Sequence, residues 1–170
     1  MRDMEKYSAK LIDSQIKKLS SRIKLSQGDV ILILMNGGAM FGHSLLSHNG
    51  FTHLRVEYAK LSSYDGQNRG EIKEIYSPDF TTFKGRRVIV LDDICDSGNT
   101  LRYIHDKLKE AEVDTRNVWY YTVIKRDGAN LYKDMQYECL IEDHSEDFFY
   151  GFGMDSSDGT GRNLKYIGVE

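Results

Sequence analysis

The sequence predicts an α/β protein with a mostly parallel central sheet and helices on both of its faces. Continuous apolar runs at Val30–Met35, 87–91 and 118–124 are typical of strands that are buried on both sides. Segments with apolar residues at helical spacing lie between these runs, so that strands and helices alternate along the chain. The length of 170 residues favours a single domain.

The individual elements are separated by glycines and polar turns. Residues 4–24 are expected to form an amphipathic helix, because their apolar side chains recur every three or four positions. In chain order, the elements expected after it are a strand at 30–35, a helix at 39–46, strands at 54–61, 72–76 and 87–91, a helix at 101–111, and strands at 118–124, 137–141 and 149–154. Residues 64–71 are polar and contain two glycines, which predicts an exposed loop.

Composition and charge exclude several classes of protein. The formal net charge of −3 argues against a general binder of nucleic acids or anionic membranes. The longest apolar run, Val30–Met35, is too short to span a bilayer, and the N-terminus lacks the apolar core of a signal peptide. Two cysteines, Cys95 and Cys139, make no disulfide framework, so reduced thiols and a cytoplasmic location are expected.

Polar segments follow three of the predicted buried strands. The first is 36–38, with the sequence Asn-Gly-Gly, the second is 92–100, and the third begins at Lys125. In open parallel sheets, ligands bind beyond the carboxyl ends of the strands. These segments are therefore expected to converge on one binding site.

The segment 92–100 carries the most chemical information. Its second half, Ser-Gly-Asn-Thr, forms a small turn into a helix, where backbone N–H groups and the helix dipole favour an anion. Asp92, Asp93 and Asp96 would repel a bare phosphate, whereas carboxylates bind hard cations and accept hydrogen bonds from vicinal hydroxyls. A ligand with a phosphate at one end and a diol near the other satisfies both halves, and ribose 5-phosphate has this shape.

A receiver domain also places an acidic pair and a lysine on a parallel sheet. In that class the pair follows the first strand, whereas Asp92 and Asp93 follow a middle one, and the turn at 97–100 would have no role. The sequence has no Walker lysine, zinc-ligand spacing or Gly-x-Ser-x-Gly elbow. The phosphate-and-diol interpretation is therefore preferred.

Residues 88–101 resemble the phosphoribosyl diphosphate (PRPP) motif of type I phosphoribosyltransferases. Further segments resemble parts of the hypoxanthine-guanine branch in the same order. Residues 31–41 resemble its pyrophosphate turn, 61–64 the start of its active-site loop, and 123–126 its purine-reading strand end. Residues 148–155 and 162–168 resemble its C-terminal hood. The resemblance covers nearly the whole chain. It implies the type I phosphoribosyltransferase fold, with one domain over 1–170 and a small hood built mainly from 126–170, to which the N-terminus could contribute.

The resemblance also implies an enzyme of purine salvage that uses magnesium to transfer the ribose 5-phosphate of PRPP to a 6-oxopurine, with release of pyrophosphate. Asp96 is then the general acid/base. The residues implied to hold PRPP at its ribose and 5-phosphate are Asp92, Asp93, Asp96, Ser97, Gly98, Asn99 and Thr100. Those implied for pyrophosphate are Asn36, Gly37 and Arg162, with Ser63 and Tyr64 beginning the active-site loop. Those implied for the purine are Lys125, Phe148, Phe149 and Asp155, and those for magnesium are Asp92, Asp93 and Asp155.

Some positions depart from the family pattern. Asn36 stands where the family usually has lysine or arginine, and the loop 63–71 is short. The stretch from Asp155 to Arg162 is one residue longer than usual, and the acidic segment 127–147 differs most. Two alternatives therefore stay open: a transferase for xanthine or a modified purine, and a non-catalytic sensor of PRPP or a nucleotide. The resemblance further implies a homodimer or homotetramer with PRPP and a 6-oxopurine as partners, and a tendency toward a cis peptide bond at Met35–Asn36.

Overall fold

The computed structural model describes residues 4–48, 50, 51, 53–63 and 71–170. A six-stranded sheet with the strand order β4-β3-β2-β5-β6-β7 forms its centre. Its strands are β2 (Val30–Met35), β3 (Arg55–Ser63), β4 (Ile72–Tyr76), β5 (Val88–Cys95), β6 (Val118–Arg126) and β7 (Gln136–Asp143). Neighbouring strands are parallel except β3 and β4, which confirms the expected mostly parallel sheet.

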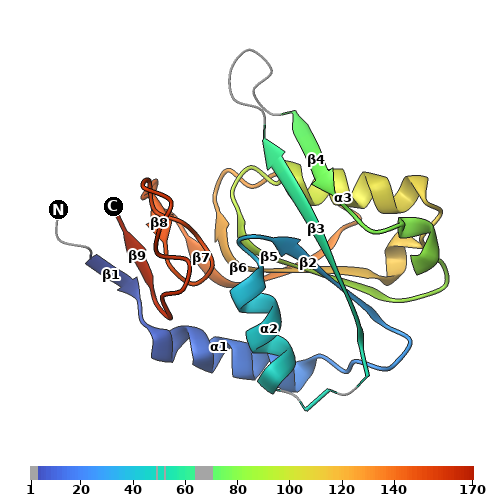
Figure 1. Cartoon of the computed structure of the whole chain (residues 1–170), viewed down its shortest axis with the longest axis horizontal. Coiled ribbons are helices and arrows are strands. Elements are labelled where there is room, and N and C mark those ends of the chain that lie inside the picture. Colours follow the sequence, from blue (N-terminus) through green and yellow to red (C-terminus); the bar gives the residue numbers. More distant parts are fainter. Residues whose placement is uncertain (1–3, 49, 52, 64–70) are drawn as a thin grey trace.

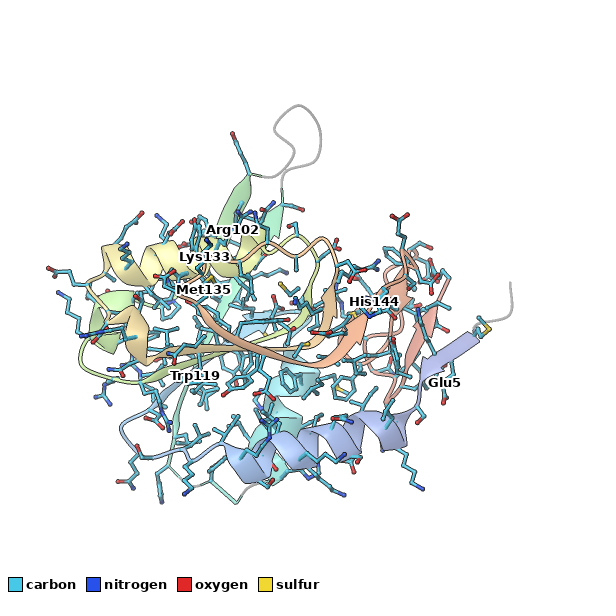
Figure 2. All side chains as sticks on the ribbon, turned by 180° about the vertical axis from the view of Figure 1, so that it is seen from behind. Glu5, Arg102, Trp119, Lys133, Met135 and His144 are labelled. Atoms are coloured by element: carbon cyan, nitrogen blue, oxygen red, sulfur yellow. The ribbon has the colours of Figure 1, made fainter. Side chains whose placement is uncertain are left out.

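Helices cover both faces of this sheet (Figure 1). Helices α1 (Ala9–Arg22) and α2 (Ala39–His48) pack on one face, and α3 (Asn99–Glu110) packs on the other with the short 3-10 turn η1 (Phe80–Phe83). A second 3-10 turn, η2 (Thr115–Asn117), leads into β6. In Figure 2, Trp119 lies on the α1 side of the sheet and Met135 on the α3 side. None of the helices in the described part of the chain is long and apolar enough to cross a bilayer.

The continuous apolar sequence of β2 follows from this two-sided cover. Ile31 and Ile33 belong to the core under α1 and α2, whereas Val30, Leu32 and Leu34 belong to the core under α3. Side chains alternate between the faces of a strand, so a strand with helices on both sides needs apolar residues at every position. The carboxyl end of β2 thereby lies beside that of β5, where the polar segments begin.

A second, three-stranded sheet lies at one end of the molecule, with the order β1-β9-β8 (Figure 1). We call it the small sheet; its strands are β1 (Met4–Tyr7), β8 (Phe149–Tyr150) and β9 (Ile167–Val169). The expectation of a helix from residue 4 was wrong for this first turn. Ser8 caps α1 by accepting a hydrogen bond from the Leu11 amide, and Met4 pairs instead with Val169. The partner strand lies at the other end of the chain, beyond any local pattern.

Most other boundaries differ from expectation by one or two residues, and the ends of three strands differ in a way that affects the site. Strands β5 and β6 continue to Cys95 and Arg126, so Asp92, Asp93 and Lys125 lie inside strands rather than after them. The expected strand at 149–154 ends at Tyr150. Gly151 and Gly153 follow with φ of 90° and 101°, a backbone conformation in which side-chain-bearing residues are strained and a strand cannot continue.

A cluster of polar side chains connects the small sheet to the end of β7. The Lys6 ammonium lies 2.9 Å from the Asp143 carboxylate and 2.6 Å from that of Asp147. The Tyr7 hydroxyl also donates to Asp143, which is buried. Burial alone would raise the pKa of Asp143, but hydrogen bonds from Ser145, Tyr7 and Lys6 outweigh it and hold that pKa well below its usual range.

Replacing Asp143 with asparagine is therefore expected to lower the free energy of unfolding at pH 7 by about 2–4 kcal/mol, because Lys6 and Tyr7 lose a buried ionised partner. A folded-state pKa below the unfolded value of about 3.9 gives stabilisation that is present above that pH and lost as the pH falls. The deficit of Asp143→Asn should thus be largest at neutral pH and shrink below about pH 4. Urea denaturation of both proteins at several pH values measures it; a deficit that does not change with pH would contradict this account.

Candidate active site

A cavity of about 290 Å³ lies at the carboxyl end of β5. Its lining consists of Ser63, Ile72 and the continuous segment 92–101. This segment includes every residue that the sequence implied for the ribose and 5-phosphate. We call it the phosphate-loop cavity.

The turn at 97–100 owes its shape to Gly98, which has φ of 88° and precedes the first residue of α3. The turn rests on the segment after β6. The Asn130 amide donates to the Ser97 carbonyl at 2.9 Å, and a Cβ at Gly98 would lie only 2.5 Å from the Asn130 carbonyl oxygen. Asn130 is a supporting residue that the sequence analysis missed, because it lies in the segment that departs most from the family pattern.

Asp92 and Asp93 place two carboxylates side by side at this cavity. Asp92 Oδ1 accepts from the Asp93 amide at 2.9 Å, and Asp93 Oδ1 accepts from the Ile94 amide at 2.7 Å. Burial raises the pKa of both groups, and the negative charge of Asp93 raises that of Asp92 further. A cation or a set of hydroxyl donors beside the pair would stabilise its ionised form.

The donor chemistry of this pair fits magnesium, which prefers carboxylate oxygens. Among the described residues, no group of three or more His, Cys, Asp or Glu side chains is assembled around a metal position. Magnesium typically takes only one or two carboxylates from a protein and fills its remaining positions with water and substrate phosphates. Asp92 and Asp93 therefore suit a magnesium ion that arrives with a phosphorylated substrate.

The turn after β2 packs directly against Asp93. A Cβ at Gly37 would lie 1.9 Å from Oδ2 of Asp93, so only glycine allows this approach. The Met35–Asn36 peptide bond is cis, and the Asn36 side chain is exposed. The end of β2 and the end of β5 thus meet, as the sequence predicted.

The C-terminal segment reaches the same place. A Cβ at Gly153 would lie 2.1 Å from the Gly37 carbonyl oxygen. The Arg162 guanidinium donates to the Gly153 carbonyl at 2.7 Å and lies 2.7 Å from the Asp155 carboxylate. Gly37, Asp155 and Arg162 are thereby brought together beside Asp93.

A second cavity, of about 240 Å³, lies under the small sheet. It is lined by Asp93, Ile94, Asp96, Arg126, Phe148, Phe149, Met154 and Asp155. We call it the aromatic cavity. Phe148 is 52% exposed and can offer a ring face to a ligand, whereas Phe149 is buried. Of the four residues implied for the purine, Phe148, Phe149 and Asp155 lie here together with Asp96.

Lys125 is the fourth, and the structure does not place it in the aromatic cavity. It lines a separate cavity with Tyr137, Cys139 and Glu142, and its ammonium lies 4.0 Å from the Glu142 carboxylate. Arg126 lines the aromatic cavity instead. Because both residues belong to β6, their side chains point to opposite faces. The sequence analysis ended this strand at residue 124, so it did not predict that the side chains of residues 125 and 126 would alternate between the two faces.

Ser63 lines the phosphate-loop cavity as expected, whereas Tyr64 lies outside the described residues. Cys95 is buried beside the site, and burial raises the pKa of its thiol to about 11. The thiol is therefore neutral at physiological pH. This agrees with a packing role and not with a nucleophile.

Comparison with known proteins identifies the family of this chain. The family model described as a phosphoribosyl transferase domain matches residues 5–157. The chain belongs to the phosphoribosyl transferase family. All the residues that line the two cavities lie within the matched segment. Of the implied site residues, only Arg162 lies beyond it.

Relatives within the family cover nearly the full length. The hypoxanthine-guanine phosphoribosyltransferase of Streptococcus agalactiae is 31% identical over 169 residues, which is 96% of this chain and 90% of the relative. A hypoxanthine phosphoribosyltransferase from Staphylococcus aureus has a similar structure, with a TM-score of 0.79 at 24% identity over 97% of this chain and 89% of that one. The enzyme from Trypanosoma cruzi, solved with its product IMP, gives a TM-score of 0.80 at 20% identity over 99% and 93% of the two chains.

These matches confirm the resemblance and the type I phosphoribosyltransferase fold that the sequence implied. The family-level signal came from the segment 88–101, which forms β5, the turn at 97–100 and the start of α3. The roles of individual residues depend on the geometry of this chain, which is described above.

Proposed function

We propose that the protein transfers the ribose 5-phosphate of PRPP to a 6-oxopurine, hypoxanthine or guanine, giving the nucleoside monophosphate and pyrophosphate. One observation carries this proposal: the phosphate-loop cavity and the aromatic cavity share Asp93, Ile94 and Asp96 in their linings. A phosphorylated ribose in the first cavity and a planar base in the second would meet at these residues. A nucleotide is the product that occupies both cavities.

The roles follow the chemistry of each position. The turn at 97–100 binds the 5-phosphate through its amides and hydroxyls, and Asp92 and Asp93 accept hydrogen bonds from the ribose hydroxyls. Gly37 and Arg162 bind the pyrophosphate, and Arg162 already lies close to Asp93. Asp96 exchanges a proton with the imidazole part of the base, as general acid/base. Holding base and ribose in line lowers the barrier by orienting the reacting atoms.

We propose magnesium as the cofactor, held by Asp92 and Asp93 on the ribose side and by Asp155 on the pyrophosphate side. When bound, it would offset the negative charge of the leaving pyrophosphate. Asp155 is half-buried, and its pairing with Arg162 places a cationic side chain and a carboxylate at the same point. Both groups suit a pyrophosphate that carries a metal ion.

Phe148 stacks on the purine in this proposal, and the Phe149 backbone reads its edge. The resemblance implied Lys125 as the donor to the exocyclic 6-oxygen, but Lys125 lies outside the aromatic cavity and its ammonium stands 4.0 Å from the Glu142 carboxylate. The proposed base site therefore does not include Lys125.

We further propose that the chain is one domain in which the small sheet and the segment 144–170 form a hood over the base. The expected hood of 126–170 was too long, because residues 136–143 form β7 of the six-stranded sheet. Ser63, which lines the phosphate-loop cavity, would help to exclude water from bound PRPP. A homodimer or homotetramer in the cytoplasm fits the family resemblance. The free thiols of Cys95 and Cys139 suit such a reducing compartment.

The acidic segment 127–147 favours one second candidate, a transferase for xanthine or a modified purine. Asp147 of this segment directly precedes Phe148 of the aromatic cavity, so a base with a different pattern of donors and acceptors could be preferred. The non-catalytic sensor is disfavoured, because Asp96 and an aromatic base site are both retained.

The test is formation of nucleoside monophosphate from PRPP and magnesium, with guanine, hypoxanthine, xanthine and adenine assayed in parallel. Turnover with guanine or hypoxanthine and none with adenine is the expected result. Turnover with xanthine alone would select the second candidate. Binding of PRPP without turnover of any base would support the sensor and contradict the proposal. Omission of magnesium, with added EDTA, tests the cofactor in the same assay.

A further inference from the structure

Arg126 occupies a position in the aromatic cavity that the general chemistry of the family reaction does not explain. Its side chain is 17% exposed, and its guanidinium stands 4.7 Å from the centre of the Phe149 ring. A guanidinium stacked on an aromatic face is held in one orientation, because both groups are planar. The stacked pair forms one wall of the cavity.

The outer nitrogens of Arg126 bind the chain just before Phe148. Nη1 donates to the Ser145 carbonyl at 3.0 Å, and Nη2 donates to the Asp147 carbonyl. These carbonyls belong to the short connection between β7 and β8. Arg126 thus fixes the backbone that carries the proposed stacking ring and the proposed edge-reading peptide.

The inner nitrogen of Arg126 lies close to the proposed general acid/base. Nε is buried and makes no hydrogen bond within the described part of the chain, but it lies 3.4 Å from Oδ1 of Asp96. A small movement of the exposed Asp96 side chain would turn this ion pair into a charge-assisted hydrogen bond. Nε therefore forms an ion pair with the Asp96 carboxylate and has no other polar partner among the described residues.

We propose that Arg126 is a positioning residue that joins the base-stacking segment to Asp96. One rigid guanidinium holds the 145–149 backbone at one end and orients the Asp96 carboxylate at the other. The base enters between these two groups, so their spacing decides how it binds. The inference rests on the proposed function and adds a positioning residue to the same site. Lys125, its neighbour on β6, faces the opposite side and cannot replace it.

The test compares Arg126→Met and Arg126→Lys with the wild-type protein. Methionine keeps the length and apolar bulk but removes the two hydrogen bonds and the ion pair, and lysine keeps the charge but lacks the planar fork. Both variants are expected to raise KM for guanine or hypoxanthine by about 10–100-fold and to lower kcat, since the two hydrogen bonds to the backbone before Phe148 and the orienting contact with Asp96 are lost. KM for PRPP should change by less than about threefold, because Arg126 does not line the phosphate-loop cavity.

The matched control is Arg116→Met, which removes an exposed arginine that pairs with Asp114 on η2, outside both cavities. It should leave both KM values unchanged. A merely structural role for Arg126 would lower the melting temperature and kcat while leaving KM for the base as in the control, and that result would overturn the proposal. A wild-type KM for the base in Arg126→Lys would also overturn the proposal, because a positive charge without the planar guanidinium would then be enough to position the base.

Calorimetric titration with guanosine monophosphate separates this proposal from the proposed function. The product occupies both cavities without reaction, so the variants should bind it at least about tenfold more weakly than the wild type and the control. An inactive wild-type protein that still shows this difference would refute the catalytic function and support the role of Arg126. Equal affinities in all four proteins would refute the role of Arg126, whatever the activity.

Discussion

Replacing Asp96 with asparagine is expected to lower kcat for the 6-oxopurine by about 10²–10⁴-fold, the usual contribution of a general acid/base. Asp96 lies where the two cavities meet, and 73% of its side chain is exposed. Asparagine has the same shape but cannot accept or return the proton of the base. Because the residue is exposed, the substitution leaves no unsatisfied group in the core, and the melting temperature should change little.

The matched control is Asp127→Asn. Asp127 is exposed to a similar degree, at 70%, and pairs with His144 outside both cavities. This variant should keep wild-type kcat. Affinity for PRPP should stay within a few-fold in both proteins, since the amides of the turn at 97–100 are unchanged. Wild-type kcat in Asp96→Asn would assign proton transfer to another group and remove Asp96 from the mechanism.

The sequence predicted those parts of the site that are contiguous in the chain. Residues 92–100 supply the acidic pair, the proton-transfer group and the phosphate turn within nine positions. The apolar run of β2 predicted burial on both faces, because only a strand between two helical layers needs it. In both cases the cause and its signal lie in the same short segment.

The missed features depend on residues that are far apart in the chain. Strand β1 forms because residues 167–169 lie beside it, and residues 4–7 alone are equally compatible with a helical pattern. The roles of Lys125 and Arg126 depend on which face of β6 each one occupies. That assignment requires the true end of the strand, and strand ends are the least certain part of a sequence-based prediction. The segment 127–147 departed most from the family pattern, yet its Asn130 supports the turn at 97–100.

Replacing Gly98 with alanine is expected to cause a large loss of affinity for PRPP. A methyl group there would meet the Asn130 carbonyl oxygen at 2.5 Å and a Leu131 methyl carbon at 3.1 Å, and the φ of 88° is itself unfavourable for alanine. Gly98→Ala should therefore push the phosphate turn away from the segment that supports it. We expect KM for PRPP to rise by at least about tenfold, because a turn displaced by even 1 Å no longer directs its amides at the phosphate.

Gly85→Ala separates the steric contact from the backbone strain. Gly85 has a similar φ of 74°, but a Cβ at that position meets nothing within 4 Å. Both variants carry the cost of a left-handed alanine, about 1–2 kcal/mol, which corresponds to a fall of several degrees in melting temperature. Only Gly98→Ala should also lose affinity for PRPP. If both variants changed KM for PRPP and melting temperature by the same amounts relative to the wild type, the contact with residues 130–131 would not be what holds the phosphate turn in place.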